Sequence, residues 1–113
     1  MSKQVNNIPV AAEDGLIWGP MRLDNRYKQS NLTTVEPNVF SFSDDSQSDK
    51  ITMAVDEALY ITAGRLTITV EGDGDDYSVT GEQGDVLTIK KGATVRYQGT
   101  GETRGFLCVG ASD

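Results

Sequence analysis

Residues 56–97 constrain the fold most, because short apolar runs alternate there with turn signals. Residues 65–70 alternate Leu, Ile and Val with Arg and Thr, which is the period-two pattern of a half-buried strand. The glycines and aspartates of 72–76 favour the backbone conformations that a hairpin loop requires. No segment shows a 3.6-residue period. The pattern predicts an all-β chain whose short strands form a sandwich or barrel.

The same signals predict strands and turns over the rest of the chain. Residues 39–43 alternate phenylalanine with serine, so we expect a strand with Phe40 and Phe42 on one face. Further strands are expected at 16–18, 21–27, 33–35, 50–55, 58–62, 77–79, 85–89, 94–97 and 104–109. Turns are expected at 36–38, 63–64, 81–84, 90–92 and 99–102, where Gly or Pro interrupts the runs.

Size and charge narrow the class of protein. The 113 residues suffice for one domain with a real core, and we expect an N-terminal arm over 1–14 and a barrel over 15–113. The net charge of −7 makes nucleic acid and anionic membrane surfaces poor partners. The chain lacks a run of about 20 apolar residues, and its N-terminus lacks the apolar core of a signal peptide. We therefore expect a cytoplasmic protein.

Two motifs within residues 50–109 resemble those of the cupin superfamily. Residues 56–64, DEALYITAG, are similar to the latter half of the first cupin motif, which ends in glycine. Residues 84–92, GDVLTIKKG, are similar to the start of the second motif, with Lys90 where proline is usual. The resemblance implies a small single-domain cupin, an all-β jelly roll or double-stranded β-helix barrel.

Within the cupins, the chain is most similar to the ethanolamine-utilization cupin family. The similarity rests on the absence of histidine, the Asp-Glu-x-x-Tyr-x-x-x-Gly run from Asp56 and the Gly-Asp…Lys-Gly turn from Gly84. It implies an accessory or enzymatic role in amine or amino-alcohol catabolism. It also implies a homodimer, since cupins commonly pair through their N-terminal strands.

The chain retains one residue of the usual cupin metal site. Aligning the motifs places Ile51, Met53 and Val95 where three histidines are usual, and only Glu57 keeps its identity. A transition metal needs three or four N, O or S ligands, so a single carboxylate does not hold one. The sequence predicts neither a metal site nor a cofactor.

Glu57 and Tyr97 are the candidate catalytic residues. If Ile51 and Met53 point inward, Glu57 lies among apolar neighbours, and burial there raises the pKa of its carboxyl. A carboxyl with a raised pKa serves as a general acid or base near neutral pH. Tyr97 shares the strand parity of Val95, so we expect it to face the same cavity. The structural alternative is that Glu57 caps a loop or pairs with Arg96 or a lysine.

Four further residues are candidate ligand contacts. Trp18, the only tryptophan, is either a core anchor or a wall of the cavity, and Met53 occupies an inward position. Arg96 is the cationic candidate for an anionic substrate. Tyr60 has the opposite parity to Glu57, so it contacts either a ligand, a partner subunit or the opposite sheet.

These observations leave three functions open. In the first, the protein binds a small polar metabolite in its cavity and has an accessory or enzymatic role in amine catabolism. In the second, it is a cofactor-free isomerase, cyclase or lyase that uses Glu57 as acid and base. In the third alternative the barrel is filled and the protein is a scaffold. Cys108 lies in an apolar run, where we expect an inert thiol with a raised pKa. The volume and polarity of the cavity separate the first two functions from the third.

Overall fold

The computed structural model describes residues 4–9, 15–72, 74 and 76–111. These residues form strands, turns and loops, and none of them belongs to a helix. The described residues therefore contain no membrane-spanning helix. The strands are β1 (Gly15–Trp18), β2 (Met21–Asn25), β3 (Val35–Phe42), β4 (Ile51–Thr52), β5 (Glu57–Glu71), β6 (Tyr77–Glu82), β7 (Val86–Ile89) and β8 (Thr94–Gly110).

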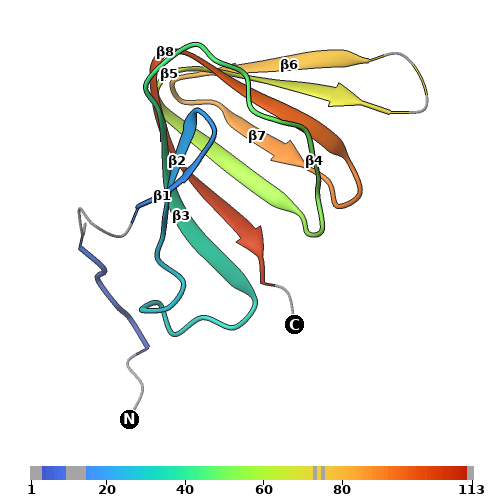
Figure 1. Cartoon of the computed structure of the whole chain (residues 1–113). Helices are drawn as coiled ribbons and strands as arrows, with labels where there is room; N and C mark the ends of the chain where they lie inside the picture. The colour runs from blue at the N-terminus through green and yellow to red at the C-terminus, as the bar shows by residue number, and fades with distance from the viewer. Residues whose placement is uncertain (1–3, 10–14, 73, 75, 112–113) are drawn as a thin grey trace.

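All eight strands belong to one antiparallel sheet that bends around its own interior. Its order is β1-β2-β3-β8-β5-β6, with β4 added to β8 and β7 added to β5. The first half of β5 pairs with β7 and with the second half of β8, which borders β3. The second half of β5 pairs with β6 and with the first half of β8, which borders β4. The β5–β6 hairpin therefore extends away from β1–β3 (Figure 1).

The bends lie within β5 and β8, where the sequence predicted turns at 63–64 and 99–102. Both predictions are wrong, because each strand continues through its glycine. The pairing shifts register on both sides of Ala63, and Gly64 takes a φ of 81°. A Cβ on Gly64 would collide with the carbonyl oxygen of Glu102. Glycine is needed here to let two bent strands pass closely, as in a β-bulge.

A third predicted turn, at 36–38, is also wrong. Pro37 and Asn38 lie inside β3, where Asn38 pairs with Asn25 of β2 and with Leu107 of β8. The alternation that buries Phe40 and Phe42 extends back to Asn38, which is 5% exposed. The strand expected at 50–55 is reduced to Ile51 and Thr52.

The core lies between the two halves of the bent sheet. Phe40 and Phe42 lie on one face of β3, as their alternation predicted, and each is 1% exposed. Their rings meet edge to face with centroids 6.1 Å apart. The other buried apolar residues are Met21, Met53, Leu59, Ile61, Leu66, Ile68, Leu87, Ile89, Val95, Tyr97 and Leu107.

The predicted N-terminal arm is described only over 4–9. Arg26 donates a hydrogen bond to the Ile8 carbonyl at 2.9 Å, which ties this segment to the β2–β3 connection. Residues 1–3 and 10–14 of the arm, and 73 and 75 of the hairpin loop, lie outside the described residues.

Candidate functional site

A cavity of about 470 Å³ opens between the β1–β2 hairpin and the inner face of the bent sheet. Most of the side chains around it are apolar, and they come from six strands or their flanks. Four residues predicted from the sequence meet here, namely Trp18, Met53, Glu57 and Tyr97. The full lining is Leu16, Ile17, Trp18, Met21, Leu23, Asn25, Asn38, Ile51, Met53, Glu57, Tyr97, Leu107 and Val109.

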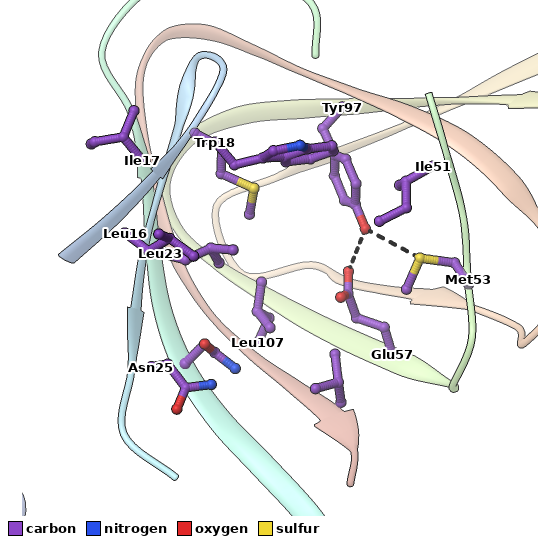
Figure 2. Close-up of a pocket in the computed structure, with 13 residues that line it drawn as sticks. Leu16, Ile17, Trp18, Leu23, Asn25, Ile51, Met53, Glu57, Tyr97 and Leu107 are labelled. Carbon is purple, nitrogen blue, oxygen red and sulfur yellow. Dashed lines mark hydrogen bonds between the residues drawn. The ribbon is translucent and has the colours of Figure 1, made fainter. Parts of the chain in front are cut away.

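A hydrogen bond between Glu57 and Tyr97 crosses the interior. The Tyr97 hydroxyl donates to Glu57 Oε1 at 2.8 Å, and the two residues are 4% and 8% exposed (Figure 2). Glu57 begins β5 and pairs with Ile89 and Val109, whereas Tyr97 lies in the first half of β8 and pairs with Ile68. The bond therefore links the two halves of the bent sheet.

Burial sets the protonation of this pair. Desolvation raises the pKa of the Glu57 carboxyl above its ordinary value, and the hydrogen bond from Tyr97 partly opposes that rise. Burial also raises the pKa of the Tyr97 phenol, and the neighbouring Glu57 carboxylate raises it further. Tyr97 therefore stays protonated as a donor, while Glu57 is the group that gains and loses a proton.

The second carboxylate oxygen of Glu57 accepts no hydrogen bond from a described residue. Within the described residues, Tyr97 provides the one hydrogen bond to this carboxylate, and it reaches Oε1. No completely buried side-chain oxygen or nitrogen there lacks a partner, so Oε2 is accessible. Because Glu57 lines the cavity, Oε2 is the acceptor of this side chain that the protein leaves unused for a ligand there.

Trp18 and Met53 hold the phenol of Tyr97 in place. The Trp18 and Tyr97 rings meet edge to face at 82°, with centroids 5.9 Å apart. The Tyr97 hydroxyl also lies 3.8 Å from the Met53 sulfur. Figure 2 shows Met53 beside the hydroxyl end of the tyrosine and Trp18 against the other part of its ring.

Arg96 and Tyr60 lie away from the cavity, contrary to the predicted ligand contacts. Arg96 forms an ion pair with Glu71 at 3.3 Å and donates to the Ser48 carbonyl. Its neighbours Val95 and Tyr97 point inward, so Arg96 must point to the other face. Tyr60 is 46% exposed on the outside of the sheet. Among the described residues no lysine or arginine lines the cavity, and Glu57 has Tyr97 as its partner instead of Arg96.

The residues at the usual cupin metal positions do not fit a metal ion. Ile51 and Met53 line the cavity with side chains that carry no strong ligand, and Val95 is fully buried in the core. Over the described part of the chain, no three His, Cys, Asp or Glu side chains cluster in a way that could hold a metal. The one carboxylate present is hydrogen-bonded to a phenol.

Sequence reasoning missed Asn38, which brings a buried carboxamide to the cavity. Its Nδ2 donates to the Glu36 carbonyl at 3.2 Å. The signal that was missed is strand parity, because Asn38 lies two and four residues before Phe40 and Phe42 and therefore faces the same side of the strand. Asn25, its cross-strand neighbour, also lines the cavity.

The fold is that of the cupins. A cupin superfamily protein from Desulfitobacterium hafniense superposes with a TM-score of 0.67 at 18% identity, over 97% of this chain and 94% of that one. No family model and no curated protein matches the sequence.

Among solved cupins, the chain is similar to proteins of ethanolamine utilization. The EutQ protein of Clostridium difficile superposes with a TM-score of 0.75 at 17% identity, covering 94% of this chain and 76% of that chain. An ethanolamine utilization protein Q from Salmonella typhimurium gives 0.64 at 22% identity, covering 80% and 68%. These values establish a shared fold.

Proposed function

We propose that this cupin binds a small organic amine in its cavity and takes part in amine or amino-alcohol catabolism. One observation carries the proposal, which is the Glu57 carboxylate at the wall of an apolar cavity with Oε2 open. A primary ammonium group is a hydrogen-bond donor of opposite charge, so it complements that oxygen. The similarity in fold to ethanolamine utilization proteins agrees with this ligand class.

The lining indicates that the amine has an apolar body. Leu23, Met53, Leu107 and other aliphatic side chains surround the cavity, and Trp18 adds an aromatic wall. Burial of alkyl or aromatic surface there contributes roughly 25 cal/mol per Å². The volume of about 470 Å³ lies within the range of small-molecule sites. This open volume favours a binding protein over a filled scaffold.

Calorimetric titration with a series of primary amines of increasing chain length tests the proposal. We expect affinity to rise with chain length and to fall by about tenfold or more in Glu57→Gln, since a charge-assisted hydrogen bond is lost. Arg96→Gln is the matched control, because Arg96 lies outside the cavity. Failure of every amine to bind the wild-type protein would refute the proposal.

The Glu57–Tyr97 pair also supports a second candidate function, an isomerase, cyclase or lyase without a cofactor. Glu57 would accept and return a proton through Oε2, because its raised pKa suits transfer near neutral pH. Tyr97 would donate a hydrogen bond throughout. If an amine or a related carbonyl compound is converted by the wild type and only bound by Glu57→Gln, the protein is an enzyme.

We also propose that the protein is a homodimer. Val39, Phe106, Tyr60 and Val86 form one row across four paired strands on the outer face, and they are 37%, 43%, 46% and 63% exposed. The next row holds Pro37, Cys108, Ala58 and Thr88, so neither row carries a charge. Two copies of a chain with net charge −7 repel each other, and the repulsion is smallest when the faces that meet carry no charge. The matching face of a second copy therefore covers these rows best.

A further inference from the structure

We infer that Asn38 is a second recognition point of the cavity and selects amines with a hydroxyl group at the far end of the molecule. This inference rests on the proposed function, because it assumes that an ammonium group occupies the Glu57 end. The observations that carry it are the burial of Asn38, the direction of its amide and its place in the sheet.

The carbonyl oxygen of the Asn38 side chain is free to accept a hydrogen bond. Nδ2 donates to the Glu36 backbone oxygen, which orients the amide and turns Oδ1 away from that carbonyl. No described residue donates to Oδ1, and no completely buried side-chain oxygen lacks a partner, so Oδ1 is accessible. Since Asn38 is 5% exposed and lines the cavity, Oδ1 is reached from the cavity.

Asn25 does not compete for this role. Its Nδ2 donates to the Glu36 carboxylate at 3.3 Å, and its Oδ1 accepts from the Tyr27 backbone at 3.0 Å. Both ends of that amide are therefore engaged within the protein. Asn38 alone of the cross-strand pair offers an unused acceptor.

The sheet register separates Asn38 from Glu57 and thus sets the length of the ligand. Asn38 pairs with Leu107, whereas Glu57 pairs with Val109 of the same strand β8. The strands that carry them, β3 and β5, flank β8 and are about 10 Å apart. Asn25, the neighbour of Asn38, and Glu57 lie on opposite sides of Leu107 in Figure 2. A ligand that touches both ends needs an apolar stem of several carbon atoms.

This geometry excludes ethanolamine as the best ligand. Its two polar groups are joined by two carbons, so it reaches one end of the cavity and leaves the apolar middle unfilled. A long-chain amino alcohol places the ammonium at Glu57, the stem along Leu107 and the hydroxyl at Asn38. The hydroxyl donates to Asn38 Oδ1, and no covalent step is required.

Competition among three matched ligands tests the inference. We expect the wild type to bind 6-aminohexan-1-ol about fivefold more tightly than hexylamine, the effect of one buried hydrogen bond. We expect ethanolamine to bind more weakly than either. Asn38→Leu removes the acceptor at similar volume, so it should abolish or reverse the preference while it retains hexylamine binding.

A variant on the same strand serves as the control. Val39→Thr changes the neighbouring residue, whose side chain lies on the outer face, and it should keep the fivefold preference. Thermal unfolding of each variant verifies that it is folded. If Asn38→Leu does not fold, Asn38→Ser replaces it and should reduce the preference.

The possible failures are distinguishable. Equal binding of the two six-carbon ligands by the wild type overturns the role of Asn38 and leaves the amine proposal standing. A preference that survives in Asn38→Leu also overturns it. Absence of binding by all three ligands overturns the proposed function itself.

Discussion

Replacement of Tyr97 by phenylalanine isolates the hydrogen bond at the centre of the site. The change removes one oxygen and keeps the ring, so the edge-to-face contact with Trp18 is retained. The loss leaves the buried Glu57 carboxylate without its hydrogen bond. A hydrogen bond to a charged group contributes about 2 kcal/mol, which corresponds to roughly 8 °C in the unfolding midpoint of a domain of this size.

The pH dependence of that loss is the sharper measurement. Because the Tyr97 hydrogen bond lowers the pKa of Glu57, removing it raises this pKa further. The cost of Tyr97→Phe should therefore grow as pH rises through the pKa of Glu57. At pH 4, where the buried carboxyl is protonated, only a neutral hydrogen bond is lost, and we expect about 1 kcal/mol. At pH 8 we expect about 2 kcal/mol.

Chemical denaturation at the two pH values, with thermal scans alongside, measures the difference. Tyr77→Phe is the matched control, because Tyr77 is 59% exposed, and it should change stability by less than about 0.5 kcal/mol. An equal cost of Tyr97→Phe at pH 4 and pH 8 would refute the assignment of an ionisable Glu57 as its acceptor.

Three further predictions test the site, the bend and the outer face. Burial raises the pKa of Glu57, so ionising this carboxyl lowers the stability of the fold once the pH exceeds the pKa of the unfolded chain. Glu57→Gln should therefore unfold at a higher temperature than wild type at pH 8 and lose that advantage towards pH 4. Gly64→Ala should cost about 3 kcal/mol or more in denaturant unfolding, because its Cβ meets the Glu102 carbonyl at a positive φ; a cost below about 1 kcal/mol contradicts the tight crossing. Light scattering should show a dimer for the wild type and a monomer for the Tyr60→Glu, Phe106→Glu double variant, whereas a wild-type monomer contradicts the proposed interface.

Local periodicity was enough to predict that Glu57 and Tyr97 face the same interior, although it did not predict the hydrogen bond between them. Glu57 and Tyr97 are 40 residues apart, yet parity relative to Met53 and Val95 placed both inward. The same rule was not applied to Arg96, which lies between Val95 and Tyr97 and therefore faces outward, so its prediction as a ligand contact was wrong. The fold class also followed, because alternation and turn signals are local properties of the chain.

The bends were not predictable from the same signals. A glycine with positive φ serves equally in a turn that ends a strand and in a bulge that bends one, and Gly64 and Gly101 are of the second kind. What distinguishes them is the partner strand across the sheet. Pro37 and Asn38 gave a second error of this kind, because these residue types are typical of turns and yet both lie inside β3.

The cavity depends on long-range packing that no short window records. The hairpin that pairs Leu16 with Leu23 forms one wall of the cavity, and the polar groups come from strands distant in the sequence. Asn38 belongs to the site only because β3 borders β8. Such contacts are fixed by strand order, which the alternation pattern leaves open.

The Glu57–Tyr97 hydrogen bond joins the two halves of the bent sheet. Both halves contain β5 and β8, which pair with each other along almost their full length. The paired residues of β5 and β8 are far apart in the sequence. Contacts of this kind slow folding, so we expect this chain to fold slowly. A partly folded chain that has formed only one half lacks one member of the pair and has no site. We expect amide hydrogens of both strands to exchange by global unfolding, with the site appearing and disappearing in a single cooperative step.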